Sequence, residues 1–316
     1  MAAYPRSARR ARGSNLITQI AVFSGKGGAG KTSFSAALVP LIAHEHDLVL
    51  VDADVDASNL HLVISHSMQT RTAFLGGKKA QIEQDACTQC GLCEKLCRFH
   101  AIHKQSAEVN SPLQFNVNTM QCEGCNLCAF QCPSHAIYME PKQDGWWFAS
   151  RSDFGAFYHA HLFPGHENSG KLVSTIISMA RSTAENAHHS ILLVDGPPGI
   201  GCPVIAASNQ SDIAIIVTEP TLSGIHDMQR ILDTTHHFQI PSFVVLNKAD
   251  LDESNAARVH AICDESDIPV LGSIPFDPAF TQAMLHAQPI TLYTPNSPSS
   301  IAIQKIWHNL NQTISL

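Results

Sequence analysis

Short hydrophobic runs alternate with longer helical stretches along most of the chain. The short runs, rich in β-branched residues and several of them stopped by glycine or proline, are typical of buried strands. They predict strands at 16–24, 48–51, 191–194, 213–217, 243–246 and 270–274. The longer stretches predict helices at 31–44, 172–186, 223–237, 253–265 and 299–309. Strands and helices in alternation favour an α/β domain whose parallel sheet is covered by helices on both faces.

One region interrupts this alternation. Between about residue 81 and residue 142 the helical period disappears and cysteines become frequent, so we expect a second domain inserted after the second strand. The expected organisation is therefore a disordered basic arm at 1–15, an α/β domain at 16–80 and 143–316, and the insertion at 81–142. A twin-arginine export signal is the alternative interpretation of the arm. The apolar run after it, however, leads into a glycine-rich loop and not into a cleavage site.

The composition is that of a globular protein. Hydrophobic residues make up 44% of the 316 positions and charged residues 15%, and no run of about 18 apolar residues predicts a membrane-spanning helix. The formal charge is −7 with no basic face in the body of the chain, which disfavours a nucleic-acid binder. Eight of the ten cysteines lie within residues 87–132, whereas a secreted disulfide scaffold distributes its bridges. We therefore expect a reducing, cytoplasmic location.

A phosphate-binding loop follows the first predicted strand. The stretch GKGGAGKT fits the pattern G-x-x-x-x-G-K-[ST] between a strand and a helix, which is the context that this motif requires. Its glycines let backbone N–H groups surround a β-phosphate, Lys31 reaches the β- and γ-phosphates, and the Thr32 hydroxyl can ligate Mg²⁺. The expected nucleotide-binding residues of the loop are Gly25, Lys26, Gly27, Gly28, Ala29, Gly30, Lys31, Thr32 and Ser33.

Acidic side chains stand at the ends of two predicted strands. The stretch VDADVDASNL places Asp52 and Asp54 after the second strand, and ILLVDGPPGIG places Asp195 after a later one. Because α/β sheets bind ligands at the carboxyl ends of their strands, we expect these carboxylates close to the phosphates.

The loop sequence SGKGGAGKTS resembles the signature loop of the MinD/ParA superfamily of dimerising ATPases. Its additional lysine, Lys26, is not needed to surround the phosphates and should point away from those of its own site. The resemblance implies that Lys26 crosses a dimer interface to the partner's nucleotide. Lys26, Lys31 and Asp54 would then be the catalytic residues.

The same resemblance gives the acidic residues their roles. Asp54 would orient the attacking water, Asp52 would lie near Mg²⁺ and a first switch, and Asp195 would hold Mg²⁺ through water. Residues 196–201 would form a second switch, whose glycines permit movement around the γ-phosphate. The metal set expected for Mg²⁺ is Thr32, Asp52 and Asp195.

The base of the nucleotide is indicated by the stretch LNKAD. Asn247, Lys248 and Asp250 fit the guanine-reading pattern N-K-x-D, whereas in MinD-like ATPases an asparagine at this strand end contacts adenine. The signature lysine favours ATP, with Asn247 as the adenine contact. The loop around Phe276, after the last strand, resembles the family's other base-side segment.

The cysteines of the insertion form two copies of one motif. The pattern C-x2-C-x2-C-x3-C occurs twice with an offset of 35 residues, and the repeat extends into His-Ala-Ile at 100–102 and 135–137. This duplication resembles bacterial ferredoxins with two [4Fe–4S] clusters, in which the fourth cysteine of each motif ligates the other cluster. The resemblance assigns one cluster to Cys87, Cys90, Cys93 and Cys132, and the other to Cys122, Cys125, Cys128 and Cys97.

Paired zinc sites and a disulfide knot are the alternatives for these cysteines. Zinc sites usually show two separated C-x2-C pairs, so repeated four-cysteine runs favour iron–sulfur clusters. One departure from the ferredoxin pattern is Arg98, which follows Cys97 where proline follows Cys132 in the second copy. His100 and His135 are expected to be structural, because eight thiolates already complete two clusters.

Two functions compete for a MinD-superfamily ATPase with an inserted ferredoxin-like α+β domain. In the first, ATP hydrolysis by a homodimer, or by a heterodimer with a related ATPase, couples nucleotide state to electron transfer, with metal-cofactor assembly as a candidate role. In the second, ATP switches a non-catalytic scaffold or redox sensor whose clusters are structural. The presence of Asp54 favours ATP hydrolysis, which we expect to be slow without a partner protein. The pair of clusters favours electron transfer. No nucleic-acid partner and no stable membrane insertion are expected, and the client is unidentified.

Cys202 lies outside the cysteine-rich region, seven residues after Asp195 at the end of the expected second switch. The nitrogenase iron protein, which this stretch resembles, has a ligand of its dimer-bridging cluster at the same distance from the equivalent acid. No other cysteine lies between Cys132 and Cys202, so two copies of the chain would supply only two thiolates. Two roles stay open, packing of the switch or contact with a metal or client at the dimer axis.

Overall fold

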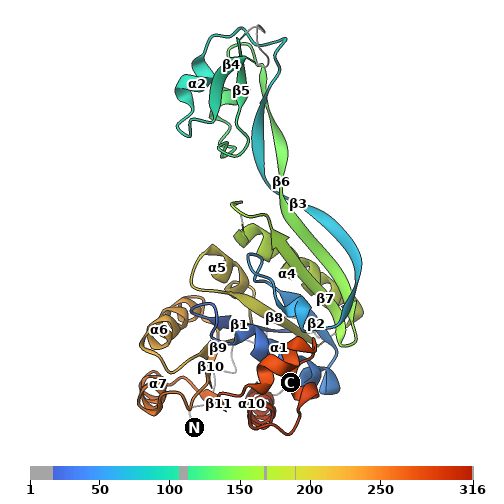
Figure 1. Cartoon of the computed structure of the whole chain (residues 1–316), viewed down its shortest axis with the longest axis vertical. Helices are drawn as coiled ribbons and strands as arrows, with labels where there is room; N and C mark the ends of the chain where they lie inside the picture. The colour runs from blue at the N-terminus through green and yellow to red at the C-terminus, as the bar shows by residue number, and fades with distance from the viewer. Residues whose placement is uncertain (1–16, 107–112, 167–168, 189, 315–316) are drawn as a thin grey trace. The chain divides into compact units, whose positions relative to one another are not determined.

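The hydrophobic runs of the sequence assemble into one large sheet. In the computed structural model, which describes residues 17–106, 113–166, 169–188 and 190–314, its strand order is β11-β10-β9-β1-β8-β2-β7-β6-β3 (Figure 1). The predicted strands all lie in it, as β1 (Thr18–Ser24), β2 (Leu48–Asp52), β8 (Ile191–Pro198), β9 (Ile213–Thr218), β10 (Ser242–Asn247) and β11 (Val270–Ile274).

The strands from β11 to β7 (Gly155–Leu162) are parallel. Their hydrophobic residues are almost all buried, as continuous apolar runs in a doubly covered sheet require. The register pairs Asp52 on β2 with Asp195 on β8. The two acidic strand ends therefore meet at the same edge of the sheet.

A wholly parallel sheet was the expectation, and it is wrong at one end. Strands β3 (His66–Ile82) and β6 (Ile137–Ser152) continue the sheet beyond β7. Only residues 153–154 join β6 to β7, and so short a connection requires antiparallel strands. Most side chains of β3 are exposed or half-buried. Its sequence consequently lacks the apolar run by which the other strands were predicted.

Helices cover both faces of the sheet (Figure 1). One face packs against α1 (Lys31–Glu45) together with α8 (Ala279–Leu285), α9 (Ile290–Tyr293) and α10 (Pro298–Ile314), and the core there includes Phe34, Ile42 and Trp307. The other face packs against α4 (Ser169–Ala187), α5 (Cys202–Ser208), α6 (Leu222–His237) and α7 (Glu253–Glu265). The predicted helices are confirmed, whereas the short α5, α8 and α9 were not predicted.

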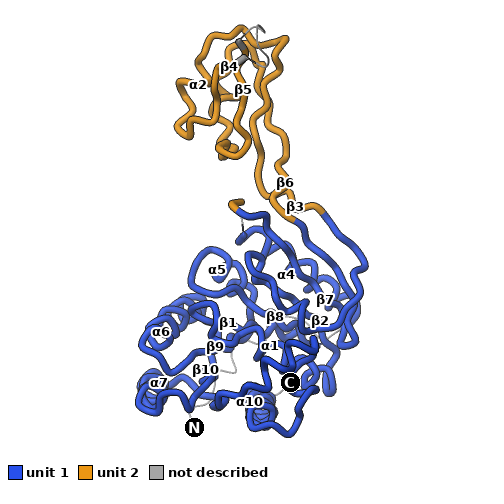
Figure 2. Tube along the Cα trace, viewed as in Figure 1, with its two compact units in different colours: residues 1–72, 146–164, 169–316 blue, residues 73–145, 165–168 orange. Residues whose placement is uncertain are grey.

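The chain divides into two compact units (Figure 2). The first comprises residues 1–72, 146–164 and 169–316, and the second comprises residues 73–145 and 165–168. The second unit contains α2 (Leu92–Leu96), α3 (Leu127–Phe130) and the antiparallel pair β4 (Ile102–Ser106) and β5 (Leu113–Val117). It is larger than the insertion expected at 81–142, because parts of β3 and β6 without cysteines belong to it. The arm expected at 1–15 lies outside the described residues.

The second unit has a small core of its own. Ala101, Ile102, Phe115, Ala136 and Ile137 are buried in it, and four of the five stand at equivalent positions of the two repeats.

Within the described part of the chain, no helix combines the length and apolar character needed to cross a membrane.

Candidate functional site

The phosphate-binding loop lies between β1 and α1. Gly28 and Gly30 have φ angles of +86° and +87°, which other residues rarely adopt. A Cβ on Gly30 would also collide with the side-chain amide of Asn247. No side chain caps the start of α1 at Lys31, so its first N–H groups stay available to an anion. Ser33 is half-buried in the same turn.

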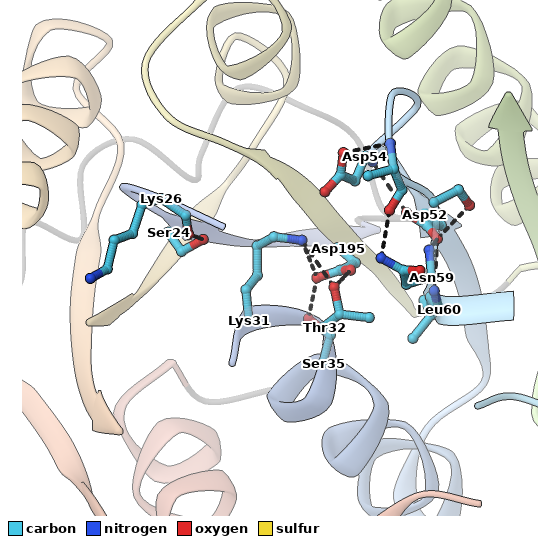
Figure 3. Close-up of polar contacts among 12 residues, drawn as sticks. Ser24, Lys26, Lys31, Thr32, Ser35, Asp52, Asp54, Asn59, Leu60 and Asp195 are labelled. Carbon is cyan, nitrogen blue, oxygen red and sulfur yellow. Dashed lines mark hydrogen bonds and ion pairs between the residues drawn. The ribbon is translucent and has the colours of Figure 1, made fainter. Parts of the chain in front are cut away.

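Asp195 is the centre of a buried polar cluster (Figure 3). Its Oδ2 accepts a hydrogen bond from Oγ1 of Thr32 at 2.7 Å, and its Oδ1 lies 3.0 Å from Nζ of Lys31. Ser35 was not predicted, yet its buried Oγ donates to Oδ1 of Asp195 at 2.7 Å. The spacing of Thr32 and Ser35, three residues apart on α1, was the available signal, because it places both hydroxyls on one helix face.

Asp52 is completely buried beside this cluster. Burial and the neighbouring carboxylate of Asp195 raise the pKa of Asp52 to about 7, and Lys31 opposes the rise. Two buried carboxylates share one lysine, so a bound cation would offset the remaining negative charge. Among the described residues, no three His, Cys, Asp or Glu side chains converge as a single-ion site. Mg²⁺ fits nevertheless, since proteins usually hold it through one or two carboxylates, substrate phosphates and water.

Asp54 follows Asp52 on the loop after β2. Its N–H donates to Oδ1 of Asp52 at 3.2 Å, and its own Oδ1 accepts from the N–H of Ala57 at 3.3 Å. Burial raises the pKa of Asp54, with Lys31 again opposing the rise. Asp54 is only partly buried, so a ligand can reach it more easily than it can reach Asp52.

Lys26 and Lys31 point in different directions from the loop (Figure 3). Nζ of Lys26 lies 3.4 Å from Oε2 of Glu219 and 3.2 Å from Oγ of Ser223. Its side chain is 36% exposed, whereas that of Lys31 is 6% exposed. Lys26 thus lies at the surface with a replaceable carboxylate partner.

Asn247 ends β10 beside the phosphate loop. Its Nδ2 donates to the carbonyl of Ala29 at 2.9 Å, and Lys248 pairs with Glu219. Asp250 accepts a hydrogen bond from the N–H of Phe276 at 2.6 Å. The two segments expected on the base side are therefore neighbours.

The segment after Asp195 depends on two glycines. A Cβ on Gly196 would collide with the ring of Phe23, and Gly199, with φ +84°, donates its N–H to the carbonyl of Ser24 at 2.9 Å. The segment ends at Cys202, which is exposed at the start of α5. Cys263 is buried in α7.

Two hollows in the second unit divide the eight clustered cysteines into sets of four. One hollow, about 370 Å³ including its open mouth, is lined by Cys97, Cys122, Cys125 and Cys128. The other, about 300 Å³, is lined by Cys87, Cys90, Cys93 and Cys132. Each set contains three cysteines of one motif and the fourth cysteine of the other copy. All ten cysteines of the chain are free.

The backbone of the two cysteine motifs repeats as their sequence does. Residues with positive φ occur at equivalent positions, in the pairs Gln89 and Gly124, Gly91 and Asn126, and His100 and His135. The N–H groups of His100 and His135 donate to the carbonyls of Cys97 and Cys132, both at 3.1 Å. These two histidines therefore shape the turns after the fourth cysteines.

Several contacts affect the ionisation of these thiols. The N–H groups of Ala101 and Ala136 donate to Sγ of Cys97 and Cys132, both at 3.3 Å. Burial opposes ionisation of Cys132, but hydrogen bonds from Ser134 and nearby amides lower its pKa below the usual range. Burial raises the pKa of Cys93 to about 11, and a bound metal would displace the proton of this thiol.

The loop, the lysine within it and the acidic strand ends define a class, the α/β nucleotide-binding proteins with a phosphate loop. Residues 20–290 match the CobQ/CobB/MinD/ParA nucleotide binding domain, and the chain belongs to this family.

Two curated relatives illustrate the range of similarity. An uncharacterised protein of Methanocaldococcus jannaschii is 33% identical over 299 residues, which cover 95% of this chain and 98% of that protein. A cytosolic Fe–S cluster assembly factor, the Nubp1 homolog of Drosophila grimshawi, is 27% identical over 133 residues, covering 35% of this chain and 43% of that protein.

Solved structures of MinD share the fold. The septum site-determining protein MinD of Pyrococcus horikoshii, complexed with Mg-ADP, superposes with a TM-score of 0.58 at 19% identity, covering 95% of this chain and 98% of that one. The cell division ATPase MinD of Pyrococcus furiosus gives 0.55 at 19% identity, with coverage of 94% and 99%. The expected α/β fold with a phosphate loop is thereby confirmed.

Proposed function

We propose that this protein is an ATP-hydrolysing dimer whose second unit holds two [4Fe–4S] clusters, and that its nucleotide state gates electron transfer through them. The observation that carries the proposal is the pair of four-cysteine hollows on a chain that also has the MinD-type phosphate loop. A phosphate loop alone would equally suit a protein without redox chemistry.

The first unit would bind ATP and Mg²⁺. Lys31 would contact the β- and γ-phosphates, and Asn247 would contact the adenine. Thr32 and Asp195, already 2.7 Å apart through a hydrogen bond, would face the magnesium ion, with Asp52 behind them. When bound, Mg²⁺ neutralises charge on the phosphates and helps to orient them.

The second unit would hold the clusters in its two hollows. Cys87, Cys90, Cys93 and Cys132 would ligate one cluster, and Cys97, Cys122, Cys125 and Cys128 the other. Such clusters transfer one electron at a time, at potentials that hydrogen bonds to sulfur and solvent exposure adjust. The amide hydrogen bonds to Cys97 and Cys132 support this ligation, because they favour the thiolate form.

Dimerisation would engage Lys26 and Asp54. Lys26 is held by Glu219 within its own chain, and a partner's phosphates would offer the same lysine a stronger anionic contact. Asp54, partly buried near Lys31, would orient the attacking water. The partner would be a second copy or a related ATPase.

Metal-cofactor assembly is the candidate process. One relative named as a cytosolic Fe–S cluster assembly factor matches 35% of this chain. Low-potential electrons and an ATP-driven switch on one protein are suited to a client that must be reduced when metal is inserted. No nucleic acid and no stable membrane insertion enter this proposal, and we place the protein in the cytoplasm.

The test measures cluster reoxidation under anaerobic conditions. The purified protein is reduced, then mixed with an excess of an oxidised viologen dye, and reoxidation is followed by absorbance without nucleotide, with Mg·ADP and with Mg·ATP. We expect Mg·ATP to change the rate in the wild type but not in Lys31→Ala. Equal rates in all three conditions, in a protein with a full complement of iron and measurable ATP turnover, would refute the gating. Iron without ATP turnover would support the scaffold or redox-sensor alternative.

A further inference from the structure

Asp52 does more in the fold than end a strand, because it organises the loop that follows. Its Oδ2 accepts three hydrogen bonds, from Oγ of Ser58 at 2.7 Å and from the N–H groups of Asn59 at 3.0 Å and Leu60 at 2.9 Å. Its Oδ1 accepts the N–H of Asp54 at 3.2 Å. Asp52 therefore fixes both ends of the segment that contains Asp54 (Figure 3).

The hydrogen bond between Ser58 and Asp52 has a definite direction. Oδ2 accepts two backbone N–H groups, so it is a hydrogen-bond acceptor that carries no proton of its own. The single hydroxyl hydrogen of Ser58 must then point to Asp52. Oγ of Ser58 also lies 3.3 Å from Nδ1 of His61. With its hydrogen committed to Asp52, Ser58 can only accept there, so His61 must carry a hydrogen on Nδ1.

The ring of His61 is held in place by other rings. It stacks on His159, with centroids 5.3 Å apart and planes at 10°, and meets His66 edge-on at 6.3 Å. His159 is buried and stacks in turn on Phe148 at 4.7 Å. Burial, with the neighbouring imidazoles, lowers the pKa of His61 and brings that of His159 to about 3. Neutral rings at fixed positions can hold one tautomer.

We propose that Ser58 and His61 are positioning residues for ATP hydrolysis. The chain of hydrogen bonds from His61 Nδ1–H to Ser58 Oγ–H to Asp52 Oδ2 holds the carboxylate of Asp52, and Asp52 in turn holds the backbone N–H of Asp54. Neither residue belongs to the phosphate loop. This inference rests on the role proposed for Asp54 in hydrolysis.

The test compares four variants by their ATPase kinetics. Ser58→Ala and His61→Leu break the chain, and we expect kcat to fall about 10- to 100-fold, the usual effect of losing a partner behind a metal site. The affinity for Mg·ADP, which depends on Lys31 and the loop, should change less than about threefold, within the scatter of such measurements. His61→Asn keeps a donor near the Nδ1 position and should retain most of kcat. His66→Leu is the control, because Nδ1 of His66 bonds the carbonyl of Ile64 and its ring meets those of His61 and His159 edge-on without joining the chain of hydrogen bonds.

Two readouts do not depend on hydrolysis. Nitrogen-15 NMR of histidine-labelled protein should show His61 protonated on Nδ1. Hydrogen exchange at the amides of Asp54, Asn59 and Leu60 should accelerate in Ser58→Ala and His61→Leu. It should stay at the wild-type rate in His61→Asn and His66→Leu. An Nε2–H tautomer for His61, or an equal loss of kcat in His66→Leu, would overturn the proposal. If the wild type itself lacks ATP turnover, the proposed hydrolysis is refuted. The tautomer of His61 and the hydrogen-exchange rates still test whether the chain of hydrogen bonds exists.

Discussion

Replacing Lys31 by methionine tests the electrostatics of the nucleotide site in the free protein. Lys31 is the buried cation of the site, with Nζ 3.0 Å from Oδ1 of Asp195 and a charge that opposes the rise in the pKa of Asp52. Methionine keeps the length of the side chain and removes the charge. We expect Lys31→Met to lose nucleotide binding and, in addition, to lose stability, because two carboxylates on neighbouring strands stay buried without a counter-ion.

The size and sign of the stability loss follow from the burial of Asp52. Its pKa rises from 3.8 to about 7, which corresponds to roughly 4 kcal/mol at about 1.4 kcal/mol per unit. A raised pKa means that the ionised form destabilises the fold, so this cost is absent below about pH 4 and complete above about pH 7. Without Lys31 the cost grows. Removing one partner of a buried ion pair typically costs about 3–5 kcal/mol, and we expect that loss at pH 8 with a smaller loss at pH 5.

Urea unfolding of the nucleotide-free protein, followed by circular dichroism at both pH values, measures these differences. Lys26→Met is the matched control. Lys26 is 36% exposed in its pair with Glu219, so its loss should change stability by less than about 1 kcal/mol. A loss below about 1 kcal/mol for Lys31→Met at pH 8, or a loss that grows towards pH 5, would contradict the assigned charges.

Three further predictions concern the dimer, the clusters and the second switch. Lys26→Ala should bind Mg·ATP but fail to dimerise, and full ATP-dependent dimerisation by light scattering would count against the proposed role. Wild-type protein prepared anaerobically should contain about eight irons per chain, whereas two zinc ions and no iron would exclude the clusters. Cys97→Ser should damage the cluster of Cys122, Cys125 and Cys128. If the exposed Cys202 contacts a metal or client, Cys202→Ser should slow transfer to that partner. Unchanged transfer together with unchanged ATP turnover would exclude such a contact.

The parallel part of the fold could be predicted because its signal is local. Each predicted strand of this part carries a continuous apolar run, and helices α4, α6 and α10 each carry an apolar face at helical spacing. Strands β3 and β6 could not be predicted in this way. They carry many polar side chains and pair with each other across about 55 intervening residues, so no short window of sequence indicates their partner.

In the nucleotide site, too, some residues could be predicted from local sequence and others could not. The loop from Gly25 to Thr32 and the acid Asp195 stand in motifs whose spacing is fixed by a strand–loop–helix unit. Neither Ser35 nor His61 stands in a recognised motif, and the bond from Ser35 to Asp195 joins residues that are 160 positions apart in the sequence. Sequence spacing could therefore indicate which groups are expected to face the nucleotide, but not which groups hold them in place.

The cysteine motifs show why spacing was more informative in the second unit. Cluster ligation depends on backbone turns that aim thiolates at a common point, and positive φ angles repeat at matching positions of the two copies. The remaining surface has diverged, since Lys95 and Arg98 of the first copy correspond to Phe130 and Pro133 of the second. If the cysteines ligate clusters as proposed, a duplication that preserves these turns while charges change gives both halves the same ligand geometry. The two clusters would then differ in their surroundings, and so in potential, more than in their ligands.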